Sequence, residues 1–117
     1  MKTENIVAEK SYAFSLKIIE VYKSLTKEKN QFVIGNQLLR SGTSIGANVE
    51  EAIGAISRKE FIAKLQISYK EARETHYWLR LLRDSNDLDA ENAKALINDC
   101  EEKLKILTSI LKSTKSS

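Results

Sequence analysis

Apolar residues recur at intervals of three and four through four long segments of this 117-residue chain, and no proline interrupts any of them. This spacing puts the apolar side chains of each segment on one face of an α-helix. Because proline is the strongest breaker of a helix interior, its absence favours long helices. No apolar stretch alternates with period two, which excludes alternating parallel strands. The pattern therefore predicts an all-α fold.

Short polar breaks separate the four predicted helices. The first helix contains residues 7–25, the break is residues 26–30, and the second helix runs from about residue 31 to residue 55. Links of only a few residues force each helix to run antiparallel to the helix before it. The sequence therefore predicts a single domain over residues 1–117, an antiparallel up-down-up-down four-helix bundle.

The ends of the third and fourth helices carry recognisable capping residues. Ser57 followed by Glu60 is the pattern of a capping box, so the third helix is expected to begin there. The polar residues 84–87 end it, and Asp89 is the expected N-cap of the fourth helix. The polar residues 113–117 are expected to fray.

The apolar line of each helix predicts the core. The second helix includes Ile56 at the end of its line, and the fourth includes Cys100, which is expected to act as a small apolar side chain. Twelve further residues are expected to be largely buried: Phe14, Ile18, Val21, Leu38, Ile45, Val49, Phe61, Leu65, Leu79, Ile97, Leu104 and Leu107.

Composition disfavours an enzyme. The chain has one cysteine and one histidine, His76, which argues against a disulfide scaffold, a metal site and a nucleophile–base pair. We therefore expect no catalytic residue, no metal and no cofactor. No secretory signal precedes the first helix, and no apolar run approaches the roughly 20 residues that would span a bilayer. The expected location is the cytoplasm.

Small residues crowd the middle of the second helix, in residues 41–48 (SGTSIGAN). Each glycine costs about 1 kcal/mol relative to alanine in a helix interior, so another interaction must offset the cost. One interpretation is structural: the small residues let a neighbouring helix approach closely, and their hydroxyls bond to preceding carbonyls. The other is a phosphate site on exposed amides, although the P-loop spacing and its preceding strand are missing. We favour the structural interpretation.

The same segment carries a resemblance to a known family. Residues 37–52 (QLLRSGTSIGANVEEA) closely resemble the signature of the bacterial four helix bundle proteins, also called 23S rRNA intervening-sequence proteins. The similarity continues through residues 58–62 (RKEFI), 64–68 (KLQIS) and 70–82 (KEARETHYWLRLL). Many relatives have a proline where this chain has Gly46, so the degree of kinking there is an open question.

The resemblance implies a fold and an assembly. It implies a left-handed four-helix bundle that assembles into a homopentameric ring. The family includes the accessory protein of diversity-generating retroelements, a basic pentamer that binds a reverse transcriptase and nucleic acid. The resemblance implies no catalytic residue.

The third predicted helix has two unlike flanks beside its core line. Residues 57–84 hold seven basic and four acidic side chains in a chain of net charge +3. Guanidinium groups pair with phosphate and tyrosine stacks on bases, so one flank is a candidate nucleic-acid surface; the alternative is a merely solvated face. Its candidate residues are Arg58, Tyr69, Arg73, Arg80 and Arg83. The other flank is the candidate oligomer interface: Ile67, Glu71, Glu74 and Trp78.

These features support one leading hypothesis and one alternative. The leading hypothesis is a non-enzymatic homo-oligomeric module that presents a basic surface to RNA or DNA, as an accessory to a nucleic-acid enzyme such as a reverse transcriptase. Unlike flanks match head to tail, which favours a closed ring; the number five comes from the resemblance alone. The alternative is a structural or protein-interaction bundle with no nucleic-acid role, which the small net charge favours.

Overall fold

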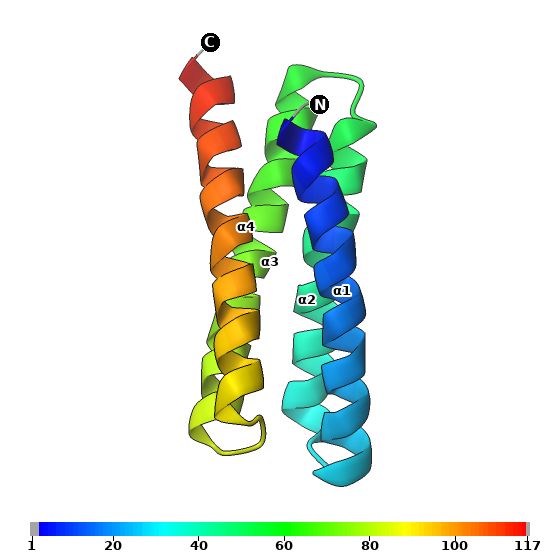
Figure 1. Cartoon of the computed structure of the whole chain (residues 1–117). Coiled ribbons are helices and arrows are strands. Elements are labelled where there is room, and N and C mark those ends of the chain that lie inside the picture. Colours follow the sequence, from blue (N-terminus) through cyan, green and yellow to red (C-terminus); the bar gives the residue numbers. More distant parts are fainter. Residues whose placement is uncertain (1–2, 117) are drawn as a thin grey trace.

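The computed structural model describes residues 3–116 and contains four α-helices and no strand within that range (Figure 1). The helices are α1 (Thr3–Glu28), α2 (Phe32–Ile53), α3 (Arg58–Asp84) and α4 (Ala90–Ser116). They form a rod with principal extents of 47 × 21 × 21 Å. The predicted all-α fold is confirmed.

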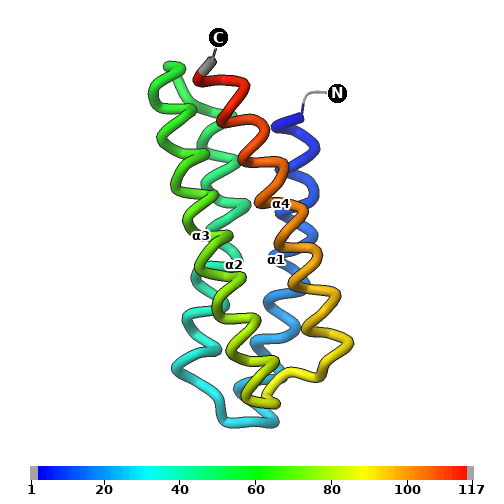
Figure 2. Tube along the Cα trace, turned by 90° about the vertical axis from the view of Figure 1, so that its left-hand side faces the viewer, coloured from blue at the N-terminus to red at the C-terminus, as the bar shows by residue number. Residues whose placement is uncertain are grey.

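Consecutive helices lie side by side and antiparallel, and α4 packs beside α1 to complete the bundle (Figure 2). The amino-terminal part of α1 and the carboxyl-terminal part of α4 lie at the same end of the rod (Figure 1). This is the predicted up-down-up-down order. None of the helices between residues 3 and 116 is long and apolar enough to cross a membrane.

Side chains cap α3 and α4 as the sequence predicts. The Ser57 hydroxyl accepts a hydrogen bond from the Glu60 amide at 3.1 Å, and the Asp89 carboxylate accepts one from the Asn92 amide at 3.0 Å. The Glu60 carboxylate reaches back to the amide of Ile56, at 3.2 Å, rather than to that of Ser57. Each cap satisfies an amide that has no partner inside its helix.

The predicted end of the first helix is displaced. The predicted break at residues 26–30 is shorter in the structure, because α1 continues to Glu28. The chain then turns at Asn30, which has a φ of 53°. Asparagine tolerates this left-handed conformation better than most residues. At the other end of the chain, α4 continues to Ser116, and Ser117 lies outside the described residues, so the fraying of residues 113–117 stays a prediction.

Most of the predicted core is buried, and Cys100 lies within it. Of the twelve residues expected in the core, Val21, Phe61 and Leu104 are only partly buried. Val21 and Leu104 line grooves between neighbouring helices, which leaves one side of each open to solvent. The placement of Ile56 on the apolar line of the second helix is wrong: its side chain is 96% exposed, because α2 ends at Ile53.

The small-residue segment lets α1 approach α2. An added Cβ at Gly42 would lie 2.9 Å from two side-chain carbons of Ile18, and one at Gly46 would lie 3.3 Å from the Cβ of Ser11. Hydroxyls in the segment bond to the preceding turn, as the Ser44 hydroxyl does to the Arg40 carbonyl at 2.6 Å. The structural interpretation of the segment is supported.

Buried hydroxyls also join this segment to α3. The Thr75 hydroxyl lies 2.9 Å from the Ser41 hydroxyl, and the Ser68 hydroxyl donates to the Ile45 carbonyl at 2.8 Å. The segment lies inside the continuous helix α2, so its amides are used within the helix and are not exposed for phosphate binding. The phosphate-site interpretation therefore has no geometric support.

Candidate nucleic-acid interface

The arginine-rich flank of α3 faces α4. A nitrogen of His76 lies 2.9 Å from the Glu101 carboxylate of α4. Near the carboxyl end of α4, the Arg58 guanidinium donates to the Thr114 carbonyl. These two contacts lie on either side of the middle of α3, and they show that α4 is the helix next to this flank. The sequence alone does not predict which helix lies there.

A groove of about 460 Å³ lies between the middle of α3 and α4. Two of the residues predicted for nucleic-acid binding, Tyr69 and Arg73, line its α3 side. The α4 side adds two lysines, two hydroxyls and an apolar side chain: Lys105, Lys112, Thr108, Ser109 and Leu104. The groove thus combines three cations and one aromatic ring, and none of its lining residues is acidic. We call these seven residues the basic groove.

Sequence reasoning missed the contribution of α4 to the basic groove. Lys105 and Lys112 are one heptad apart, so they share one face of the helix. Helical spacing could have grouped the two lysines. It could not have placed them opposite Tyr69 and Arg73, because that depends on how α3 and α4 pack.

The other predicted nucleic-acid residues lie outside the basic groove. Arg58 lies beyond one end of it, and Arg80 and Arg83 lie beyond the other. The Arg80 guanidinium is 5.7 Å from the centre of the Tyr77 ring. Arg83 donates to the Asp84 carboxylate at 2.8 Å, a bond that raises the pKa of Arg83 and lowers the pKa of Asp84. Arg83 is therefore partly neutralised.

The acidic flank of α3 faces α2, where Arg40 pairs with it. Arg40 donates to the Glu71 carboxylate at 3.0 Å and also contacts that of Glu74. Desolvation works to lower the pKa of Arg40, but the hydrogen bonds to both carboxylates outweigh it and raise the pKa. The Trp78 indole donates to Glu74 at 3.0 Å. The carboxylates predicted to meet a neighbouring subunit are thus already paired within the chain.

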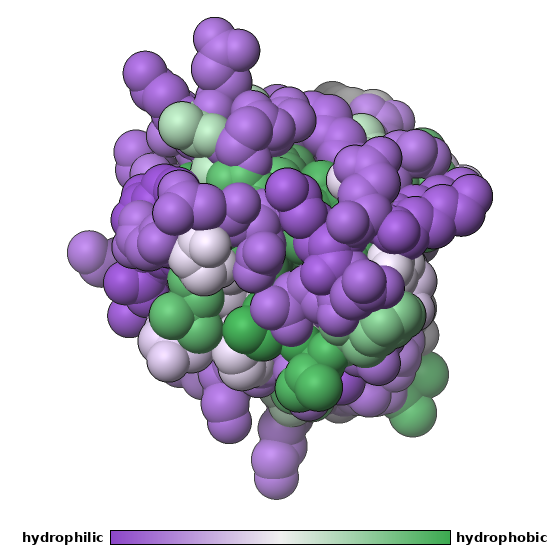
Figure 3. Space-filling model, turned by 90° about the horizontal axis from the view of Figure 1, so that it is seen from below, coloured by the Kyte–Doolittle hydropathy of each residue, from purple (hydrophilic) through white to green (hydrophobic). Residues whose placement is uncertain are grey.

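Apolar side chains outside the core remain available for contacts. Ile67 and Tyr77 are 42% and 48% exposed, and Trp78, which packs edge-on against Tyr77 with ring centres 5.2 Å apart, is half-buried. Figure 3 shows apolar side chains among hydrophilic ones at the end of the rod that carries the α1–α2 and α3–α4 connections. Phe32 and Val33, exposed at the start of α2, belong to this end.

The cysteine of the chain, Cys100, is buried in the core. Burial raises the pKa of the Cys100 thiol to about 12, and its sulfur lies 3.3 Å from the Ala72 carbonyl. A thiol with so high a pKa is a poor nucleophile at neutral pH. Within residues 3–116, no cluster of histidine, cysteine and carboxylate side chains could hold a metal ion.

Comparisons with known proteins relate this chain to one family. Residues 3–109 match the family model described as 23S rRNA-intervening sequence protein. The chain is 47% identical to a protein of unknown function from the S23 ribosomal protein family of Bacteroides thetaiotaomicron, whose crystal structure superposes with a TM-score of 0.92. That match covers 95% of this chain and 99% of the other. No functionally curated protein matches the chain.

Proposed function

The chain belongs to the family of 23S rRNA-intervening sequence proteins, and on this premise we propose that it is a non-enzymatic, oligomeric module that binds RNA or DNA. The basic groove carries the proposal. Its guanidinium and ammonium groups suit phosphate oxygens, and Tyr69 offers a ring on which a base can stack. The chain has no base-reading motif, so its binding rests on the nucleic-acid backbone and shape.

Further arginines extend this surface along α3. Arg58 and Arg80 lie on the same flank of the helix as Arg73, and the distance along the helix from Arg58 to Arg80 is roughly 33 Å at 1.5 Å per residue. A backbone that follows α3 meets cations along that length, although the chain as a whole carries only +3. Local charge, rather than net charge, is what supports the proposal.

Assembly into an oligomer would strengthen nucleic-acid binding if one groove alone binds weakly. We propose a homo-oligomeric ring, with five subunits on the strength of the family resemblance. Because Arg40 already pairs with Glu71 and Glu74, the proposed contact between subunits rests on the apolar side chains of Ile67 and Trp78. Several copies of one groove on one particle raise the avidity for a long polyanion. The proposed location is the cytoplasm, and the proposed partner is an enzyme that acts on nucleic acid.

The test is the salt dependence of binding to labelled RNA and DNA of mixed sequence, followed by fluorescence anisotropy. The variant R73Q/K105Q/K112Q removes the three cations of the basic groove. Since each phosphate contact contributes about 0.7–0.9 to the slope of log K against log salt, we expect the slope to fall by about two to three. RNA and DNA binding should weaken alike.

The matched control is K23Q/K27Q/K29Q, which removes three exposed lysines at and just beyond the end of α1. It loses the same charge but should bind as the unsubstituted protein does. Equal losses in both triple variants would mean that only net charge matters and would reject the basic groove as the site. Normal binding by the groove variant would reject it as well.

The second candidate function is a structural or protein-interaction bundle without a nucleic-acid role. The exposed apolar side chains favour it, among them Tyr12 at 66% and Val33 at 76%. The same assay separates the two candidates. No binding to either nucleic acid at about 50 mM salt, where phosphate contacts are strong, would favour the second candidate.

A further inference from the structure

The seam between α1 and α4 is held by charges over only part of its length. Lys10 of α1 pairs with Glu102 at 3.0 Å, and Lys17 pairs with Asp99 at 3.1 Å. Between them the buried Lys103 ammonium lies 5.1 Å from the centre of the Phe14 ring. Beyond Lys17, towards the α3–α4 connection, no ion pair joins the described parts of these two helices.

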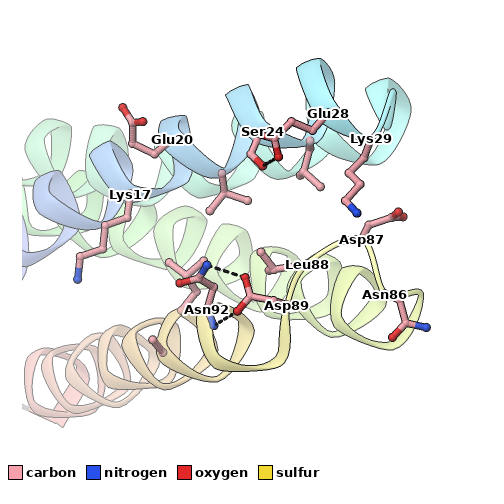
Figure 4. A pocket seen from close by; sticks show the side chains of 14 residues that line it. Lys17, Glu20, Ser24, Glu28, Lys29, Asn86, Asp87, Leu88, Asp89 and Asn92 are labelled. Carbon is pink, nitrogen blue, oxygen red and sulfur yellow. Dashed lines mark hydrogen bonds between the residues drawn. The ribbon is translucent and has the colours of Figure 1, made fainter.

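A groove of about 700 Å³ opens along that second part of the seam, and it is the largest of the grooves described here (Figure 4). Its floor is apolar, with Val21 and Leu25 from α1 and Leu96 from α4. In Figure 4 the side chain of Leu88, from the connection before α4, points into the space between the two helices. Val21 is only partly buried, whereas Leu25, Leu88 and Leu96 are buried, so Val21 is the part of this floor that a partner can reach.

The rim of this groove is acidic, in contrast to the basic groove and to the positive net charge of the chain. It carries two lysines, Lys17 and Lys29, and four carboxylates: Glu20, Glu28, Asp87 and Asp89. The Lys17 ammonium is paired with Asp99 and the Glu20 carboxylate lies 3.7 Å from the Lys23 ammonium, and both of these partners lie outside the groove lining, so the carboxylates of the rim still outnumber its cations. The rim therefore repels phosphate and attracts a cationic partner.

The groove has the length of a short helix. It follows α1 from Lys17 to the end of this helix at Glu28 and includes the next residue, Lys29, which gives a length of about 18 Å, or a little over three helical turns. An apolar floor flanked by charge along two antiparallel helices suits a third helix that inserts one apolar stripe. We propose that the α1–α4 groove docks a basic amphipathic helix of a partner protein, with the apolar stripe over the partly buried Val21 and the exposed Ala95 and the flanking cations against Glu20 and Glu28.

This proposal is independent of nucleic-acid binding, because it uses the opposite side of α4 and the opposite charge. A small organic cation would contact only part of the 18 Å length, whereas a helix of three turns matches it. The groove could also be filled by a second copy of this chain, and the experiment separates that occupant from a partner helix.

The probe is a fluorescent peptide of about 18 leucine and lysine residues, long enough to form a helix, with the leucines on one face. A peptide of the same composition with scrambled order lacks that face, and a leucine–glutamate peptide carries the wrong charge. Both should bind at least about tenfold more weakly to the full-length protein, because each lacks one of the two recognition elements. Binding is measured by anisotropy at fixed protein concentration.

Two protein variants locate the site. E20K/E28K reverses two rim charges, and A95F adds a side chain at an exposed alanine that lines the groove without changing any charge. Each should weaken binding of the leucine–lysine peptide about tenfold. The control E9K/E50K raises the net charge from +3 to +7, as E20K/E28K does, at two exposed carboxylates outside this groove, and should bind normally.

The methyl resonances of Val21 and Leu96 should shift in NMR spectra when the peptide is added, and those at the basic groove should not. No binding of the leucine–lysine peptide, equal binding by the scrambled peptide, or equal effects of E20K/E28K and E9K/E50K would overturn the proposal. A change in native mass in A95F, with no peptide binding by the unsubstituted protein, would assign the groove to a second copy instead.

Discussion

Because α1 lies so close to α2, alanine substitutions at the glycines of α2 should differ in their effect on stability. The change is Gly42→Ala, with Gly35→Ala as the matched control in the same helix. A Cβ at position 42 would lie 2.9 Å from two carbons of Ile18, whereas a Cβ at position 35 would lie 3.8 Å from its nearest neighbours. The first distance is too short for any real contact between carbons, and the second is an ordinary one.

The expected magnitude follows from two opposing effects. Replacing glycine by alanine inside a helix stabilises it by about 0.5–1 kcal/mol, and this gain is common to both variants. Overpacking at position 42 costs about 1–3 kcal/mol, since Ile18 is fully buried and its β-branched side chain has one strongly preferred rotamer. Gly42→Ala should therefore be about 1–3 kcal/mol less stable than Gly35→Ala.

Urea unfolding followed by far-ultraviolet circular dichroism measures the difference. The protein concentration is held constant, because assembly would make the apparent stability depend on it. Gly46→Ala should fall between the other two variants, as its added Cβ would lie 3.3 Å from Ser11. If Gly42→Ala and Gly35→Ala agree within about 0.5 kcal/mol, the reasoning about helix approach is refuted.

Three further predictions concern the core, the seam and the assembly. Leu107→Ala should cost about 2–5 kcal/mol in the free energy of unfolding, and Leu104→Ala less, because Leu107 is fully buried and Leu104 is not; equal losses would contradict the assigned packing. Burial works to raise the pKa of Asp99, but the bond from the Lys103 ammonium helps lower it overall, so its stabilising effect is present above about pH 4 and is lost as the pH falls through the lowered pKa. Asp99→Asn should therefore show a smaller fall in melting temperature on acidification, and an unchanged acid profile would exclude this role. Sedimentation should find an oligomer that Trp78→Ala weakens, and a concentration-independent monomer near 13.3 kDa would reject the ring.

The helices and their caps could be predicted because their causes are local. Helical periodicity depends on residues three and four positions apart, and the Ser57 and Asp89 caps act within a single turn. The antiparallel order follows from the shortness of the connections. The end of α1 was misjudged by a few residues, because polar residues such as Lys27 are as compatible with a helix as with a loop.

The candidate site was predicted in part. Helical spacing places Tyr69 and Arg73 on one flank of α3, but the cations that complete the groove, Lys105 and Lys112, come from the next helix, α4. The likeness of residues 37–52 to the family signature supplied the family, which the comparisons confirm. The family signature does not show which side chain pairs with which surface charge.

The sequence by itself determined which residues form helices, which face of each helix is apolar and, through the short connections, the order of the bundle. Tertiary structure decided which charges lie next to one another: packing brings Arg40 onto Glu71 and Glu74, and it sets Lys105 and Lys112 opposite Arg73. The physical reason is the distance along the chain over which each kind of interaction acts. Helix formation depends on neighbours within about one turn, whereas an ion pair between helices depends on their relative rotation, which is set only when the whole core packs.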